Sequence, residues 1–324
     1  MLVMNAYRFR TVDTSAYRPY TNENKACELH QKYSRLYVDN NNMYLEKPSE
    51  NTVECISNPQ KSISNTDMFF NVQNDAYCVN YCLSEDTHYL KDKTTNKQYF
   101  LGKKLFQFQI GNRYLYYMEK KSENENILWR YDFSEKAAEK LLEGNISYVM
   151  GDEEIYVCRL EGEKNSAITI TRYTEDTMEE NVVYHGWNFP WLPRLALMHE
   201  YLIFWFDSAG PVCILNLADN EMQELLPNDD AVFRICITED YLFVSTWRMV
   251  LLKPHDIKSL GIDSTYERHG VWRWSFQTKK WKRIDTEFYY DLYAFDHASV
   301  WGIDYWTNKL YQISVDGSGT VRYR

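Results

Sequence analysis

Short apolar runs separated by polar turns of two or more residues recur along most of this chain. The first pair of runs is Ser34–Asp39 with Met43–Glu46. Six further pairs of the same kind are Met68–Val72 with Ala76–Val79, Leu105–Phe108 with Tyr114–Tyr117, Ile146–Val149 with Ile155–Cys158, Leu195–Leu197 with Leu202–Trp205, Ala231–Ile235 with Tyr241–Val244, and Leu292–Phe295 with Val300–Ile303. A unit that recurs every 20–50 residues or so is typical of solenoids, propellers and other repeat arrays.

A third and a fourth strand follow most of these pairs. The third is apolar, as in Ile127–Phe133, and the fourth is more polar, as in Lys280–Ile284. Four antiparallel strands with buried inner members and a charged outer member are typical of a propeller blade. We therefore predict an all-β fold, a β-propeller of seven four-stranded blades, with six blades and a swapped closing strand as the alternative.

The same pattern predicts the domain organisation. Residues 34–324 are expected to form a single propeller domain, and residues 1–33 an N-terminal segment that contributes a closing strand. Such a strand would remove the exposed sheet edges of an open ring. Ser134–Glu143 has helical composition, but its position also suits a short outer strand with its turn.

The last repeat carries a resemblance to a known family. Val300–Asp304 reads Val-Trp-Gly-Ile-Asp, and Leu310–Ser318 ends in Asp-Gly-Ser. This unit resembles the YWTD propeller repeat of low-density lipoprotein receptors, and Phe204–Asp207 is similar in its Trp and Asp. The other five repeats share the hydrophobic rhythm alone, and the chain resembles more broadly the divergent bacterial propellers of unknown function with YWTD-like blades. The resemblance implies a propeller that binds and does not catalyse.

Composition limits the classes of partner. The chain of 324 residues has 27 Tyr, 15 Phe and 10 Trp, which favour half-buried pleated surfaces. Its net charge of −10 argues against nucleic-acid binding and against docking on an anionic membrane. No apolar run is long enough for a transmembrane helix.

Cysteine usage bears on the compartment. Seven cysteines, an odd number without disulfide-module spacing, are expected to be reduced and mostly part of the core. Because the first residues also lack a secretory-signal pattern, we expect a cytoplasmic protein. We also expect it to be a monomer.

Two long connections are expected to meet at one face of the propeller, where variable loops usually bind ligands. They are His185–Pro193, whose aromatic rings alternate between prolines, and the segment from Trp247 to Gly270. Aromatic anchors dominate many binding interfaces. The alternative is that Trp187 and Trp191 fill the gap between adjacent blades. The candidate partner-binding residues are Trp187, Phe189, Trp191, Trp247, Arg248, Tyr266 and His269.

The sequence favours a non-enzymatic module that binds a protein or peptide partner. We find no phosphate loop, no Gly-x-Ser-x-Gly elbow and no His-Glu-x-x-His helix, and we predict no catalytic residue, metal or cofactor. Adjacent acidic pairs such as Glu153 and Glu154 would point to opposite faces of a strand. The alternative is a carbohydrate-binding or carbohydrate-cleaving propeller that stacks sugars on the same tryptophans.

Overall fold

The structure is a computed structural model of the whole chain. It describes residues 35–39, 42–47, 52–56, 63–64, 68–82, 85–161, 166–189, 192–205, 212–225, 231–247, 270–286, 289–294, 298–304 and 307–322. Residues 1–33, for which we predicted a closing strand, lie outside this part of the chain. Within it, two compact units are formed, one by residues 47–197 and the other by residues 33–46 with 198–324.

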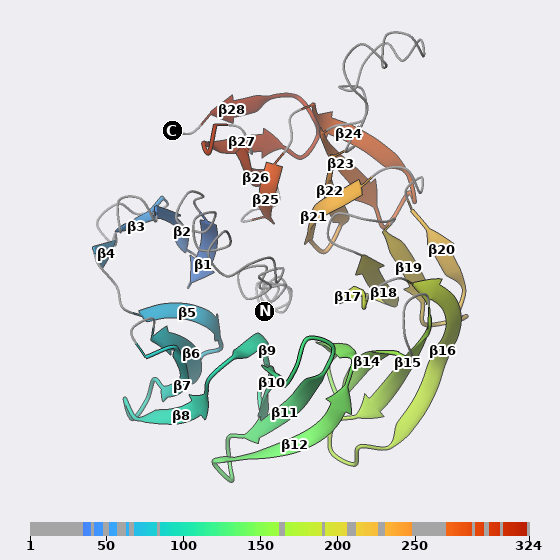
Figure 1. Cartoon of the computed structure of the whole chain (residues 1–324). Helices are drawn as coiled ribbons and strands as arrows, with labels where there is room; N and C mark the ends of the chain where they lie inside the picture. Colours follow the sequence, from blue (N-terminus) through green and yellow to red (C-terminus); the bar gives the residue numbers. More distant parts are fainter. Residues whose placement is uncertain are drawn as a thin grey trace. The chain divides into compact units, whose positions relative to one another are not determined.

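The described residues form seven four-stranded sheets, A to G, whose strands follow one another along the chain (Figure 1). Sheet A contains β1 (Arg35–Asp39), β2 (Asn42–Lys47), β3 (Thr52–Cys55) and β4 (Ile63–Ser64), and sheet B contains β5 (Met68–Gln73), β6 (Tyr77–Cys82), β7 (Thr87–Asp92) and β8 (Gln98–Gly102). Sheet C contains β9 (Leu105–Ile110), β10 (Tyr114–Lys120), β11 (Asn126–Asp132) and β12 (Ala137–Gly144), and sheet D contains β13 (Ile146–Met150), β14 (Glu154–Leu160), β15 (Ser166–Thr174) and β16 (Glu180–Phe189).

Sheet E contains β17 (Arg194–Met198), β18 (Tyr201–Trp205), β19 (Cys213–Asn216) and β20 (Met222–Glu224), and sheet F contains β21 (Ala231–Ile237), β22 (Tyr241–Trp247), β23 (Gly270–Ser275) and β24 (Trp281–Asp285). Sheet G contains β25 (Tyr289–Ala294), β26 (Ser299–Asp304), β27 (Leu310–Ser314) and β28 (Thr320–Arg322). These sheets confirm the predicted all-β repeat of four strands. The segment of ambiguous composition, residues 134–143, forms a turn and most of β12.

Strand β10 shows where the core lies in the first unit. Its side chains alternate between two faces of sheet C, as in any strand. Tyr114, Tyr116 and Met118 pack with the inner strands of sheet D, whereas Leu115 and Tyr117 pack with sheet B. All five are buried. The core therefore fills the spaces between consecutive sheets that pack face to face.

The second unit repeats this arrangement between sheets F and G. Phe243 and Val271 of sheet F form one buried cluster with Tyr289, Val300 and Ile313 of sheet G. Sheets F and G therefore also pack face to face around a buried apolar core.

Five of the third strands end in the same turn. A polar residue begins the turn, and the residue four positions later has a left-handed φ of 53–59°. The first residues are Asp92, Asp132, Thr174, Asn216 and Ser275, and the left-handed residues are Asn96, Lys136, Met178, Asn220 and Lys279. The first side chain commonly accepts backbone amide hydrogens of the turn, as Asp132 Oδ1 does from Ser134 N at 2.7 Å. Such side-chain bonds explain how a chain with few glycines forms these turns.

In six sheets, a further backbone bond joins the end of the third strand to a neighbouring turn. The amide that follows the third strand donates to a carbonyl in the turn between the first and second strands of the same sheet. The pairs are Lys93 with Ala76, Phe133 with Arg113, Glu175 with Glu153, Leu217 with Glu200, Phe276 with Asp240, and Val315 with Ala298, at 2.8–3.1 Å. We call this end of each sheet the tied end. The opposite end, which carries the second-to-third connection and the connection between sheets, is the open end.

Six cysteines lie in the described residues and form no disulfide there. Cys55, Cys78, Cys158 and Cys213 are buried, as expected for small apolar side chains, and Cys82 and Cys236 are partly exposed. In the part of the chain that the structure describes, no helix is long and apolar enough to cross a membrane.

Candidate functional site

The prediction that His185–Pro193 forms a connection is partly wrong. Residues 185–189, assigned from sequence to a connection, belong to β16, which pairs with β15 up to Phe189 opposite Ser166. The register shifts between Ala167 and Ile168, so Trp187 lies at a β-bulge. The strand continues because residues 182–185 supply Val, Val, Tyr and His, which suit a pleated outer strand.

The other predicted residues divide into two groups. Trp247 is the last residue of β22, where it pairs with Ala231. Trp191, Arg248, Tyr266 and His269 lie outside the described residues. Since strand direction alternates within a sheet, both the Phe189 end of β16 and the Trp247 end of β22 lie at the open ends of their sheets.

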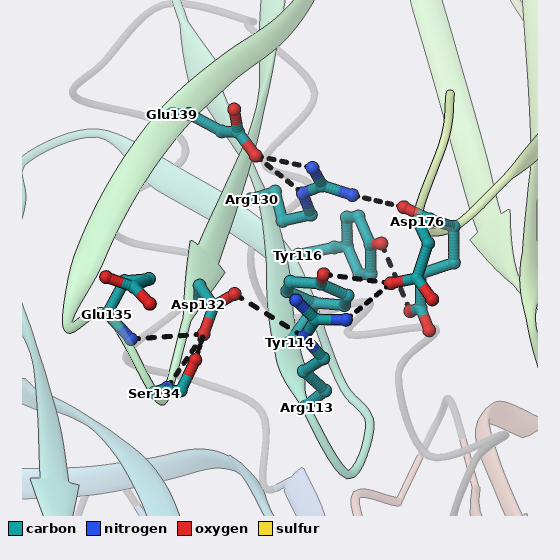
Figure 2. Close-up of polar contacts among 10 residues, drawn as sticks. Arg113, Tyr114, Tyr116, Arg130, Asp132, Ser134, Glu135, Glu139 and Asp176 are labelled. Atoms are coloured by element: carbon teal, nitrogen blue, oxygen red, sulfur yellow. Dashed lines mark hydrogen bonds and ion pairs between the residues drawn. The ribbon is translucent and has the colours of Figure 1, made fainter. Parts of the chain in front are cut away.

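A polar cluster that sequence analysis did not anticipate lies at the tied ends of sheets C and D. Two arginines converge on the ring of Tyr114, with guanidinium carbons 4.7 Å (Arg113) and 4.5 Å (Arg130) from the ring centroid (Figure 2). Arg113 belongs to the turn before β10 and Arg130 to β11. Stacking of guanidinium groups on an aromatic face is favourable and fixes their planes.

Arg130 is the buried half of the cluster, with a side chain that is 10% exposed. Its Nε donates to Glu139 Oε1 at 2.8 Å, and its Nη1 donates to the Glu175 carbonyl in the β15–β16 turn (Figure 2). A buried charge requires such partners, because leaving it unpaired would cost several kcal/mol, about 3–5 in typical cases. This side chain therefore joins sheet C to sheet D.

Arg113 is the exposed half. Its Nη1 lies 2.6 Å from Asp176 Oδ1, with 54% and 65% of the two side chains exposed. The Tyr114 hydroxyl donates to the same carboxylate oxygen at 3.1 Å (Figure 2). Asp132 completes this side, with Oδ2 3.5 Å from Arg113 Nε.

Burial and pairing shift the pKa values of the cluster in opposite directions. Burial raises the pKa of Glu175 above its ordinary value, although its Oε1 accepts a hydrogen bond from the Tyr116 hydroxyl at 3.1 Å. Burial likewise raises the pKa of Tyr116, so this phenol stays protonated. For Asp132, burial is outweighed by hydrogen bonds from Ser134 and Glu135, which lower the pKa of its carboxyl.

The side chains of this cluster have a structural role, and we call the cluster the brace. Its arginines, carboxylates and phenols bind one another and hold the β15–β16 turn against sheet C. Sequence alone gave no signal for it, since Arg113 and Asp176 are 63 positions apart. In the described residues, no group of three or more His, Cys, Asp or Glu side chains could hold a metal ion.

Comparisons with known proteins define the class. No protein-family model matches the chain, and no curated protein matches its sequence. Among solved structures it is similar to oligogalacturonate lyase in complex with manganese (TM-score 0.55, 11% identity, covering 89% of this chain and 83% of that one). It is also similar to the β-propeller domain of the Trilobed protease from Pyrococcus furiosus (TM-score 0.50, 9% identity, covering 90% and 85%).

A puromycin-hydrolyzing peptidase of Mycobacterium tuberculosis gives a TM-score of 0.58 at 9% identity, covering 90% of this chain and 53% of that one. At these identities the likeness concerns the fold alone. Together with the repeated four-stranded sheets, it defines this protein as a β-propeller. Relationship to the YWTD family stays a prediction.

Proposed function

We propose that this β-propeller is a non-enzymatic module that binds a protein or peptide partner at the open ends of its sheets. The observation that supports this is the difference between the two ends. In sheets B to G, a backbone hydrogen bond joins two short turns at the tied end. In sheet F, β22 ends at Trp247 and β23 begins at Gly270, both at the open end. A rigid base that carries variable connections loses little entropy on binding.

Trp187 and Trp247 each lie at the open end of their own sheet. Trp187 stands at a bulge near the end of β16, and bulges commonly redirect a side chain or end the pairing of a strand. Trp247 closes β22. Large rings at such positions are suited to act as anchors for a partner.

The YWTD-like character of sheet G is part of this proposal. Asp304, at the motif position, accepts hydrogen bonds from the backbone N and the Oγ1 of Thr307, each at 2.6 Å. Asp316 accepts from Ser318 N at 2.8 Å, next to Gly317 with φ 74°. These contacts support a motif whose acidic residues close turns.

The test is affinity capture with three forms of the purified protein: wild type, Trp187→Ala/Phe189→Ala, and Phe100→Ala. Phe100 is 66% exposed on β8 and serves as the matched aromatic control. We expect one protein to be retained by wild type and Phe100→Ala, and to bind the double variant at least about tenfold more weakly in calorimetry with purified components.

Equal retention by the double variant would contradict the proposal. A glycan array is run in parallel with the same three proteins. A saccharide that binds wild type and Phe100→Ala, but not Trp187→Ala/Phe189→Ala, would establish the carbohydrate alternative instead.

A further inference from the structure

A cationic outer strand stands out on this acidic chain of net charge −10. Residues 279–283 read Lys-Lys-Trp-Lys-Arg, and they span the end of a turn and the start of β24. Lys279, Lys280 and Lys282 are all exposed. Strand β24 is the last strand of sheet F, and none of the described strands pairs with its outer edge.

Lys279 and Lys280 lie in the turn before β24, and Lys282 lies within the strand. Among the described residues, no Asp or Glu lies within ion-pair distance of Lys279, Lys280 or Lys282. Lys282 donates instead to the Asp316 backbone carbonyl, while the Asp316 carboxylate accepts from Ser318 N. The Lys279 ammonium lies 6.0 Å from the centre of the Tyr201 ring.

The outer strand of sheet C is the opposite case. On β12, Lys140 pairs with Glu143, and the Glu139 carboxylate is paired with Arg130. The charges of that edge are thus satisfied within the sheet. In its excess of positive charge, β24 therefore differs from β12.

Neighbouring side chains hold β24 in place, and Lys282 takes part through its bond to the Asp316 carbonyl. Trp281 Nε1 donates to the Leu225 carbonyl at 2.5 Å, which fixes one face of β24. On the other face, Arg273 of β23 donates to the Val315 carbonyl at 2.7 Å. Arg273 is opposite Lys282 in the pairing of β23 with β24. A preformed edge requires little ordering when a ligand binds.

From these observations we propose that β24 binds an acidic, extended peptide segment of a partner, which adds to sheet F as a fifth strand. An unpaired sheet edge supplies a row of backbone donors and acceptors whose spacing matches that of an extended peptide. Lys280 immediately precedes β24 and Lys282 lies within it, and their spacing of two positions matches carboxylates at alternate positions of an added strand. This surface is distinct from the open end of the proposed function.

The experiment measures fluorescence anisotropy with three labelled peptides at low ionic strength. One alternates Val and Glu, one replaces each Glu by Gln, and one carries a central Pro in place of Val. Protein samples are wild type, Lys280→Glu/Lys282→Glu, and the control Lys97→Glu/Lys103→Glu, whose lysines are exposed near β8. Circular dichroism confirms that each variant is folded.

We expect the Val-Glu peptide to bind wild type and the control alike, and to bind Lys280→Glu/Lys282→Glu at least about tenfold more weakly, because charge pairs are lost and like charges are added. Binding should weaken as salt is raised. The Gln and Pro peptides should bind several-fold more weakly, since one lacks the charge and the other a backbone donor.

Unchanged affinity in the β24 variant, or equal loss in the control, would overturn the proposal. So would equally tight binding of the Pro peptide or of a labelled oligonucleotide, because either result would mean general attraction of anions. Self-association of the wild type, abolished by the β24 substitutions, would assign the edge to a second copy and would also overturn it. None of these results depends on Trp187, so failure here leaves the proposed function standing.

Discussion

Gln107 and Tyr148 exchange two hydrogen bonds between the first strands of sheets C and D. The Gln107 amide Nε2 donates to the Tyr148 carbonyl at 2.7 Å, and the Tyr148 hydroxyl donates to the Gln107 carbonyl. Gln107 has a φ of 53°, and the pairing of β9 with β10 shifts register at this point. A β-bulge interrupts the ladder locally, so the neighbouring sheet supplies the missing partner.

Tyr148→Phe should therefore lower the free energy of unfolding by about 1–3 kcal/mol, because it removes the donor to the partly buried Gln107 carbonyl without changing the packing of the buried ring. Urea unfolding followed by tryptophan fluorescence measures the change. The control is Tyr89→Phe, whose hydroxyl bonds Glu85 at the exposed surface and should cost less than about 0.5 kcal/mol. Equal effects of the two substitutions would contradict the role assigned to Tyr148.

The two arginines stacked on Tyr114 should differ in their contribution to stability. Arg130→Met removes charge-assisted bonds from a buried position and is expected to cost about 2–3 kcal/mol. Arg113→Met removes an exposed ion pair with Asp176 and should cost less than about 1 kcal/mol. Thermal unfolding of both variants tests the difference. A larger loss of stability in Arg113→Met than in Arg130→Met would contradict this assignment, because it would mean that the exposed ion pair contributes more than the buried bonds.

Gly302 illustrates a position where packing excludes any side chain. A Cβ at Gly302 would lie 2.5 Å from the Tyr289 ring, whereas a Cβ at Gly319 would meet no atom within 4 Å. We expect Gly302→Ala to destabilise the protein by about 1–3 kcal/mol through overpacking. Gly319→Ala is the matched control, and its free energy of unfolding should stay within about 0.5 kcal/mol of the wild-type value. A neutral Gly302→Ala would mean that the Tyr289 ring can move aside.

His88 should make stability depend on pH. It is buried between the rings of Tyr81 and Phe108, with centroids 4.7 and 4.8 Å away, and burial lowers its pKa to about 4 despite the nearby Asp86. The unfolded chain therefore takes up the proton first. Stability from this group is complete above pH ~6.5 and falls as the pH drops toward about 4, by roughly 3 kcal/mol.

Urea unfolding at several pH values from 7.5 to 4 measures this loss in wild type and in His88→Phe. The variant keeps an aromatic ring between the same neighbours but cannot be protonated, so its stability should decline less steeply. Parallel pH curves for the two proteins would show that His88 does not titrate as its burial requires.

The repeated turn was visible in the sequence in part. A polar residue begins the turn in Asp92, Asp132 and Asn216, and this position is a recognisable turn signal. The left-handed position is occupied by residues as different as Asn96, Lys136 and Met178, so no residue type marks it. The conformation there is imposed by the hydrogen bonds of the hairpin.

Local pattern alone determined most of the strands, their order and their grouping in fours, because short apolar runs between polar turns indicate strands that are buried on both faces. Pairing between neighbours in the chain then needs no long-range information. The tertiary structure decided which second-strand side chains face which neighbouring sheet, that residues 185–189 continue β16, and that Arg113 and Arg130 meet a turn of the next sheet. Such contacts join residues tens of positions apart, and they depend on how sheets pack face to face, for which a one-dimensional pattern carries no signal.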